Sequence, residues 1–278
     1  MAQRPVSGGS RNSVRTIIST DMDGTLLGHE DFAFEPALPL IRELNALDIP
    51  IVLNTSKTAV EVLSWQAKLG ISGPAIVENG SAIINPVGST ADGTGVDALD
   101  SMHVYGAQMA ELDGFVRSVA PGATNLLQCD AQLAGELTGL AGAQLRAALS
   151  RQFSIPLKFD DSVERDAFIQ SAQARGLQCK QGGRFLSLQG ACDKGATLQH
   201  LVADFEQAWQ SDVCVVALGD NHNDLGMLQI ADLPIVVNTA SGHELRIASP
   251  TAIYTSAQAP EGWVEGVKAA LSRLSIFD

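Results

Sequence analysis

Residues 17–27 read IISTDMDGTLL, an apolar and β-branched run that ends on two aspartates one residue apart, followed by glycine. Residues 14–19 have the composition of a buried parallel strand, which is apolar without alternation. In open α/β sheets ligands bind at the carboxyl ends of such strands, so Asp21 and Asp23 are expected where a ligand would bind. The two carboxylates repel each other unless a cation or a shared proton compensates them. We therefore predict a ligand-binding corner, although Asp and Gly are also common in ordinary turns.

The composition is that of a folded, strongly acidic protein. The 278 residues, 45% hydrophobic with a mean hydropathy of +0.11, suit one large domain or two modest ones, with a monomer or homodimer expected. No apolar run is long enough to span a membrane. The net charge of −13 argues against nucleic acid and anionic membrane surfaces as partners. The same charge would repel a phosphate substrate, so a site for one must contain local positive charge.

Four scattered cysteines, Cys129, Cys179, Cys192 and Cys214, form no close pair. This usage predicts a reduced, cytoplasmic protein and argues against a zinc site or a disulfide scaffold. Residues 1–13 are predicted to form a disordered tail.

Strands and helices alternate at both ends of the chain. Residues 49–53 and 75–77 predict strands, and helical patterns begin at Pro36 and at Thr58, which forms a capping box with Glu61. A short strand or hairpin partner is expected at residues 82–84. After residue 189 the pattern resumes with the helices, strands and closing helix predicted at 198–209, 213–218, 225–230, 234–237, 253–254 and 263–274. This rhythm predicts an α/β protein built on a doubly wound parallel sheet.

The middle of the chain has a different texture. It combines helical patterns with a strand at 155–159 and a hairpin around Gly182-Gly183, which is typical of antiparallel structure. We predict a core formed by residues 14–86 and 190–278, with residues 87–189 inserted as a separate α+β domain.

Three apolar strands end in polar clusters that can converge on one site. Phosphoryl transfer needs a nucleophile, a metal, further donors and an acid for the leaving group. Asp21 can attack phosphorus to form an aspartyl-phosphate, and Asp23 can protonate the leaving oxygen and then deprotonate water. Asp220 supplies a second carboxylate for Mg²⁺, which prefers carboxylate and phosphate oxygens. Thr55 or Ser56 offers donors, and Lys194 offers a compact positive charge.

Each of these residues also has a purely structural interpretation. Thr55 and Ser56 can simply lead into a helix cap, and Lys194 can be a solvated turn residue. Residues 220–224 can form a polar loop, to which we assign His222. The order of the elements favours the catalytic interpretation, because a carboxylate pair, a hydroxyl cluster, an insertion, a lysine and further carboxylates follow one another.

The same residues resemble the four motifs of the haloacid dehalogenase-like (HAD) phosphatases. The matching segments are Asp21-Met22-Asp23-Gly24-Thr25-Leu26-Leu27, Thr55-Ser56, Lys194 and Gly219-Asp220-x-x-Asn223-Asp224. The position of the insertion resembles the type with an α+β C2 cap (type IIB). Within the family, the chain resembles the mannosyl-3-phosphoglycerate phosphatases. That resemblance rests on Asn54-Thr55-Ser56-Lys57-Thr58 with Glu61-Val62, Val77-Glu78-Asn79-Gly80, Arg151-Gln152-Phe153-Ser154, Gly182-Gly183-Arg184-Phe185 and Asp193-Lys194-Gly195.

The resemblance implies roles for individual residues. Catalysis is expected of Asp21, Asp23, Thr55 and Lys194. Mg²⁺ is expected on Asp21, the backbone carbonyl of Asp23 and Asp220, with Asp224 nearby or acting through water. Substrate contacts are expected from Ser56, Lys57, Glu78, Asn79, Gly80, Arg151 and Arg184, of which Lys57, Arg151 and Arg184 would supply local positive charge.

The implied activity is Mg²⁺-dependent hydrolysis of mannosyl-3-phosphoglycerate to mannosylglycerate and phosphate. Ile155-Pro156 stands where the family often has an acidic residue next to proline, so glucosyl-3-phosphoglycerate or another sugar phosphate is the alternative substrate. A phosphohexomutase and a non-catalytic sugar-phosphate-binding protein are the rival functions. Release of free phosphate distinguishes hydrolysis from both.

Overall fold

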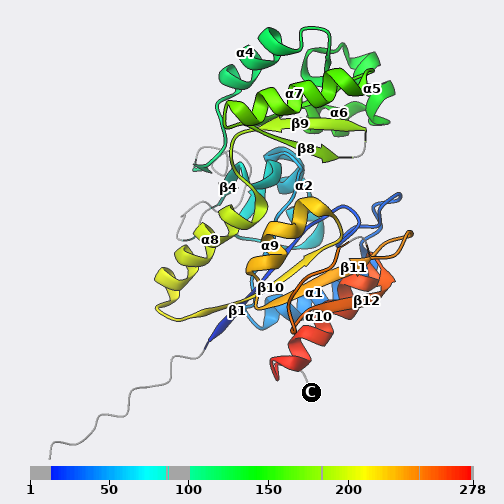
Figure 1. The fold of residues 1–278 in the computed structure, drawn as a ribbon. Coiled ribbons are helices and arrows are strands. Elements are labelled where there is room, and N and C mark those ends of the chain that lie inside the picture. The colour runs from blue at the N-terminus through cyan, green and yellow to red at the C-terminus, as the bar shows by residue number, and fades with distance from the viewer. Residues whose placement is uncertain (1–13, 86, 88–100, 183, 244, 277–278) are drawn as a thin grey trace, which may run out of the picture.

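The computed structural model describes residues 14–85, 87, 101–182, 184–243 and 245–276, and they form two parts (Figure 1). The larger part is a core of strands and helices from both ends of the chain, and the smaller part is a cap from the middle. The tail predicted at residues 1–13 lies outside the described residues. None of the described helices is both long and apolar enough to cross a membrane.

A five-stranded sheet organises the core, and its strand order is β12-β11-β10-β1-β2. All of its pairs are parallel, and Ile18 of β1 lies between Val216 of β10 and Ile51 of β2. The strands are β1 (Arg15–Thr20), β2 (Ile51–Leu53), β10 (Val213–Gly219), β11 (Leu233–Asn238) and β12 (Ile253–Gln258). The predicted α/β fold with a parallel central sheet is therefore confirmed.

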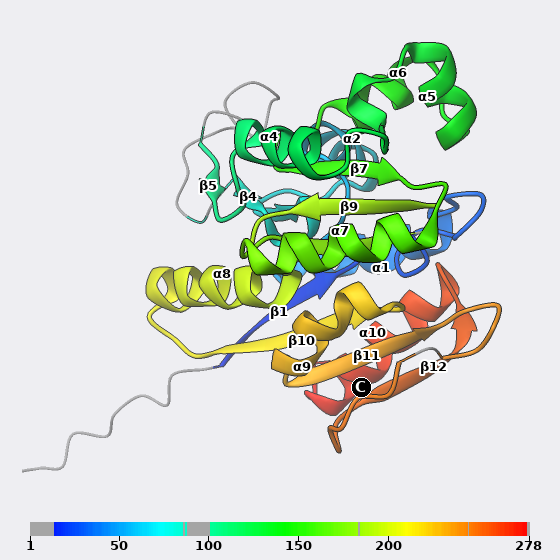
Figure 2. The same cartoon turned by 45° about the horizontal axis from the view of Figure 1, so that its top comes forward.

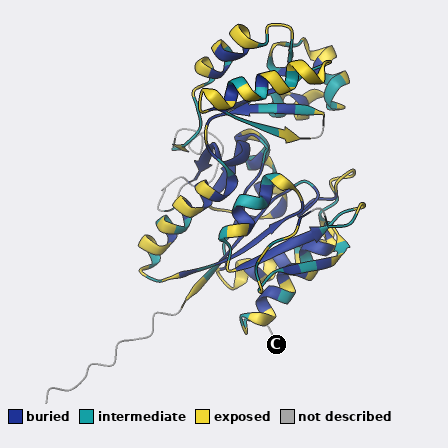
Figure 3. Cartoon of the chain, viewed as in Figure 1, coloured by how far each residue is buried: buried dark blue, intermediate teal, exposed yellow. Residues whose placement is uncertain are grey.

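Helices cover both faces of this sheet because its strands are apolar on both sides. Ile18 and Val216 pack against helices on one face, and Ile17 and Val215 pack against those on the other. The first face is covered by α1 (Leu38–Ala46), α2 (Ala59–Leu69) and α10 (Glu261–Arg273), and the second by α8 (Lys194–Trp209) and α9 (Leu225–Ile230). Figure 3 shows the buried strands between helices whose outer faces are exposed.

The strand predicted at residues 75–77 differs from the expected pattern. β3 (Ala75–Val77) meets the core sheet through a single parallel bridge, from Ile76 to Asn54, and otherwise pairs antiparallel with β4 (Ala82–Ile84). The chain reverses between β3 and β4 in a 3-10 turn, η2 (Glu78–Gly80), whose three residues all have positive φ. β5 (His103–Val104) pairs with β4, although we predicted residues 87–189 to belong to the cap. The domain boundaries otherwise stay a prediction.

The cap is a four-stranded antiparallel sheet of order β6-β7-β9-β8, with helices on its outer face (Figure 2). Its strands are β6 (Thr124–Asn125), β7 (Ser154–Lys158), β8 (Gln178–Gly182) and β9 (Phe185–Gln189). The helices on this face are α4 (Met109–Val119) and α7 (Ser162–Ala174), and α5 (Ala131–Thr138) and α6 (Gly142–Leu149) form a separate cluster with Leu126. Ile155 and Leu188 pack against α4 and α7, so the alternate residues of these strands point the other way.

Candidate active site

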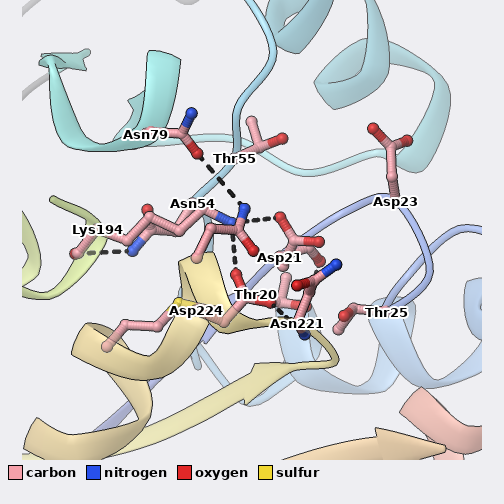
Figure 4. A network of polar contacts seen from close by, with 12 residues as sticks. Thr20, Asp21, Asp23, Thr25, Asn54, Thr55, Asn79, Lys194, Asn221 and Asp224 are labelled. Atoms are coloured by element: carbon pink, nitrogen blue, oxygen red, sulfur yellow. Dashed lines mark hydrogen bonds and ion pairs between the residues drawn. The ribbon is translucent and has the colours of Figure 1, made fainter. Parts of the chain in front are cut away.

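Asp21, Lys194 and Asp224 form a buried ion cluster at the carboxyl end of the core sheet (Figure 4). Lys194 Nζ lies 2.5 Å from Asp21 Oδ1 and 2.6 Å from Asp224 Oδ1, and its side chain is fully buried. Asp21 follows β1, and Asp224 ends the 3-10 turn η4 (His222–Asp224) that follows β10. Lys194 is the first residue of α8, whose N-cap Asp193 accepts hydrogen bonds from the backbone N–H groups of Gly195 and Ala196. Two strand ends and a capped helix therefore bring these charges together.

The cluster has more negative than positive charges, and this excess acts together with burial on the pKa values of Asp21, Asp220 and Lys194. Burial raises the pKa of Asp21 well above its usual value, and the neighbouring Asp224 and Asp220 add to this although Lys194 opposes it. Burial and Asp224 raise the pKa of Asp220 to about 6. Burial alone would lower the pKa of Lys194, but Asp21 and Asp224 outweigh it and raise that pKa above its ordinary value. The corner thus has more carboxylates than its single lysine can neutralise.

The donor set fits a divalent cation with oxygen ligands. Ligand atoms of Asp21, Asp220 and Asp224 lie within 4.8 Å of one another. The Thr25 hydroxyl donates to Asp220 Oδ1 at 2.9 Å, which orients that carboxylate. Asp224 Oδ2 accepts the N–H groups of Asp220 and Asn221, both at 3.1 Å, and its Oδ1 accepts Lys194. Asp21 and Asp220 are therefore better placed than Asp224 to bind Mg²⁺ directly.

Asp23 lies apart from this cluster and pairs with a different lysine (Figure 4). Lys57 Nζ lies 2.8 Å from Asp23 Oδ2, and the Asp23 side chain is 36% exposed, against 8% for Asp21. Asp23 Oδ1 has no hydrogen-bond partner among the described residues. The two aspartates of one short motif thus have different surroundings, which suits two different chemical roles.

The polar residues after β2 and β3 form one wall of the site. Thr55 is buried, its Oγ1 accepts Lys57 N at 3.2 Å, and its carbonyl accepts Asn79 N at 2.9 Å. Asn79 Oδ1 lies 3.5 Å from Asn223 Nδ2, which connects this wall to the end of β10. Asn54 Nδ2 donates to the backbone carbonyl of Lys194 at 3.1 Å. This wall therefore holds the backbone of Lys194 through Asn54, and its residue Asn79 lines the same cavity as Asp21 and Asp220.

A cavity of about 340 Å³ lies between the core and the cap, and residues of both parts line it. Core residues in the lining include Asp21, Asp23, Ser56, Lys57, Asn79 and Asp220, and cap residues include Arg151, Pro156, Lys180, Phe185 and Ser187. Pro156, Ser187 and Lys180 are paired across β7, β9 and β8, so one cross-strand row of the cap faces the carboxylate corner. A ligand held at the corner would therefore also meet the cap sheet.

Three expected substrate contacts lie outside this lining. The Glu78 carboxylate instead accepts hydrogen bonds from Gln152 N, Phe153 N and Ser154 Oγ of the cap. Gly80 packs against the backbone of α8, where a Cβ would lie 2.3 Å from the Asp193 carbonyl oxygen. Arg184 is exposed and donates to the Thr138 carbonyl at 3.4 Å. For Glu78, Gly80 and Arg184 substrate contact stays a prediction.

Comparison with known proteins agrees with this geometry. The model of the haloacid dehalogenase-like hydrolase family matches residues 18–94 and 183–258. The chain belongs to the haloacid dehalogenase-like hydrolases. It is also 30% identical over 263 residues to a glucosyl-3-phosphoglycerate/mannosyl-3-phosphoglycerate phosphatase of Persephonella marina, covering 93% of this chain and 98% of that one.

Solved structures of low identity share the fold of this haloacid dehalogenase-like hydrolase. A HAD-superfamily phosphatase from Bacteroides thetaiotaomicron has a TM-score of 0.66 at 15% identity, covering 98% of this chain and all of its own. The sucrose-phosphatase of Synechocystis, solved with sucrose and phosphate, has a TM-score of 0.61 at 14% identity, covering 95% and 99%. Both matches extend over the cap as well as the core.

Sequence reasoning missed several residues that the structure places at the site of this hydrolase. Thr25 lies inside the motif at Asp21, so its position alone was a usable signal. Lys180 and Ser187 were not identified, because a lysine and a serine in a hairpin have no local signature. Their register with Pro156 becomes visible only when the strands of the cap are paired.

Proposed function

We propose that this chain is a Mg²⁺-dependent phosphomonoesterase that hydrolyses mannosyl-3-phosphoglycerate to mannosylglycerate and phosphate. Glucosyl-3-phosphoglycerate is the alternative substrate, and the name of the Persephonella marina relative includes both. The observation that carries the proposal is the pair of carboxylates in the lining of the cavity between core and cap. Asp21 is buried beside Lys194, and Asp23 is partly exposed beside Lys57.

The two carboxylates divide the chemistry between them. Asp21 attacks phosphorus and forms an aspartyl-phosphate as the bond from phosphorus to the substrate oxygen breaks. Asp23 protonates that leaving oxygen, and then takes a proton from the water that attacks the aspartyl-phosphate. Phosphate leaves and the Asp21 carboxylate is regenerated. Lys194 holds Asp21 in place through their 2.5 Å contact.

The residues that would hold Mg²⁺ are Asp21 and Asp220, with the backbone carbonyl of Asp23 and, through water, Asp224. When bound, the ion supplies Lewis-acid stabilisation of the charge that develops on the phosphoryl oxygens. Thr55, Ser56 and Asn79 then offer donors to the same oxygens from the wall formed after β2 and β3.

The cap favours a substrate with an anionic group besides its phosphate. Arg151 and Lys180 line the cavity on the cap side, although the net charge of the protein is −13. A glycosyl-3-phosphoglycerate carries such a group in the carboxylate of its glycerate.

The four cysteines are free thiols, which supports a reduced, cytoplasmic location for the reaction.

Phosphate release is the test of this function. Mannosyl- and glucosyl-3-phosphoglycerate are assayed with and without Mg²⁺ beside simple sugar phosphates, and we expect the glycosyl-3-phosphoglycerates to have the highest kcat/KM. Asp21→Asn should lower kcat by at least about a thousandfold, because the nucleophile is lost, and leave the circular dichroism spectrum unchanged. Binding of the substrate without phosphate release by the wild type would favour the non-catalytic function, and phosphate retained on a sugar would favour a mutase.

A further inference from the structure

Glu78 is a core carboxylate whose hydrogen-bond partners belong to the cap. The residue is 1% exposed and lies in the reversal between β3 and β4. Its Oε1 accepts Gln152 N at 2.8 Å, and its Oε2 accepts Phe153 N at 3.2 Å and Ser154 Oγ at 2.5 Å. A buried carboxylate is tolerated only when donors satisfy it, so residues 152–154 are held firmly against the core.

The residue just before this segment is Arg151, which lines the same cavity as Asp21 and Asp23. Its Nη1 donates to Ser154 Oγ at 3.0 Å and to the Ser56 carbonyl at 3.2 Å. Ser154 Oγ therefore links the Glu78 carboxylate to the guanidinium. Arg151 Nε has no hydrogen-bond partner among the described residues, so the guanidinium still holds an unused donor.

We infer that Glu78 is a positioning residue that fixes the Arg151 guanidinium in the cleft through Ser154. A free arginine side chain loses much conformational freedom when it binds an anion, and one held in advance loses less. The network therefore prepares Arg151 to bind the part of the substrate that lies beyond the reacting phosphate. The inference rests on the proposed function, because it is tested by measuring hydrolysis of a substrate that reaches the cap.

Two substitutions separate this role from that of a simple tether between core and cap. Glu78→Gln keeps the size of the side chain, but its amide group would face a donor where an oxygen now accepts one. Ser154→Ala removes the hydroxyl that donates to Glu78 and accepts from Arg151, and it keeps both bonds from the backbone N–H groups to Glu78. Both variants are compared with the wild type on the glycosyl-3-phosphoglycerate that it hydrolyses and on p-nitrophenyl phosphate, which lacks the glycosyl and glycerate groups.

We expect KM for the glycosyl substrate to rise about tenfold in Glu78→Gln and about threefold in Ser154→Ala, with kcat little changed. Hydrolysis of p-nitrophenyl phosphate should fall much less in both. A parallel loss on the two substrates would overturn the inference, because Glu78 would then support the catalytic core in general. Should Glu78→Gln not fold, as judged by thermal unfolding, Ser154→Ala alone still decides.

A double-mutant cycle with Arg151→Met tests whether Glu78 acts through the guanidinium. If it does, adding Glu78→Gln or Ser154→Ala to Arg151→Met should change KM little further. A full additional increase of KM in the double variants would show that Glu78 acts by another route. Absence of phosphate release by the wild type on every substrate would instead be a failure of the proposed function, and the two failures are thus distinguishable.

Discussion

At the scale of single residues, the site is defined by an excess of carboxylates in a small buried volume. Asp21, Asp220 and Asp224 share one ammonium group, that of Lys194. The cost of this arrangement is visible at Asp220, whose pKa is raised to about 6 by burial and by Asp224. A bound cation would remove that cost, so pH and metal should act on the same residue.

In EDTA, we expect the free energy of unfolding to depend on pH through Asp220. The folded-state pKa of Asp220 lies above its unfolded value of 3.8, so the folded protein is favoured while this carboxyl is protonated. Its contribution to the free energy of unfolding is therefore fully present below pH 3.8 and is lost as the pH rises through about 6. Asp220→Asn should therefore raise the free energy of unfolding, by about 1 kcal/mol at pH 4.5 and about 3 kcal/mol at pH 7. Urea unfolding at the two pH values measures this.

Mg²⁺ provides the control for that measurement. Added at pH 7, it should stabilise the wild type much more than Asp220→Asn, because the variant lacks one of the proposed ligands. An equal difference between variant and wild type at both pH values would contradict the assignment of the titration to Asp220.

At the scale of elements, the position of Lys194 depends on a close contact between α8 and α9. A Cβ on Gly195, the residue after Lys194, would lie 2.4 Å from the backbone of Gly226. Such a distance is not tolerated, so any larger residue must push the two helices apart. The small size of Gly195 thus keeps the start of α8 against the start of α9, which directly follows Asp224.

We expect Gly195→Ala to lower the free energy of unfolding by about 1–3 kcal/mol, because the overpacked helices must separate. Since the separation moves Lys194 relative to Asp21, kcat should also fall, by about 10- to 100-fold. Urea unfolding and phosphate release measure the two effects.

Gly114→Ala is the matched control for this substitution. Gly114 lies inside α4 with no atom within 4 Å of a Cβ, so the substitution should leave kcat unchanged and stabilise the protein by up to about 1 kcal/mol. A kcat of Gly195→Ala equal to that of the wild type would show that the helix contact does not position the lysine.

At the scale of the whole molecule, a protein with a net charge of −13 is proposed to bind an anion. The cations that line the cavity resolve this conflict locally. Lys57 pairs with Asp23, and Arg151 donates hydrogen bonds to Ser56 and Ser154. Among the described residues Lys180 has no ion-pair partner, so its charge is the one most available to a ligand.

We therefore predict that Lys180→Gln raises KM for a glycosyl-3-phosphoglycerate about three- to tenfold, with a smaller effect on p-nitrophenyl phosphate, which has no second anionic group. Steady-state kinetics at low and high salt measure this, and the difference should shrink in high salt. Lys158→Gln is the matched control, because Lys158 is a cap lysine that pairs with Asp160 and does not line the cavity. Equal effects of the two substitutions would indicate that only the overall charge matters.

Much of the fold could be predicted because its signals are local. The apolar run before Asp21, the capping box at Thr58 and the hairpin at Gly182 each depend on residues close together in the chain, and the structure has a strand, a helix and a hairpin there. The prediction that residues 75–77 extend the parallel sheet was only partly right. The three positive φ values of η2 reverse the chain after a single bridge to the core sheet. The residue types of Glu78–Gly80 did not predict a reversal so soon after the strand begins to pair.

The sequence by itself determined which residues meet at the corner, because Asp21, Asp23 and Asp220 follow the ends of strands and Lys194 begins a helix. Only the tertiary structure decided what surrounds them. The partners of Glu78 lie 74 to 76 residues further along the chain, and Lys180 shares a row with Pro156 only because β9 pairs with β7 as well as with β8. Such contacts depend on how the cap packs on the core, which is a balance of burial and hydrogen bonding between distant segments that no local pattern encodes.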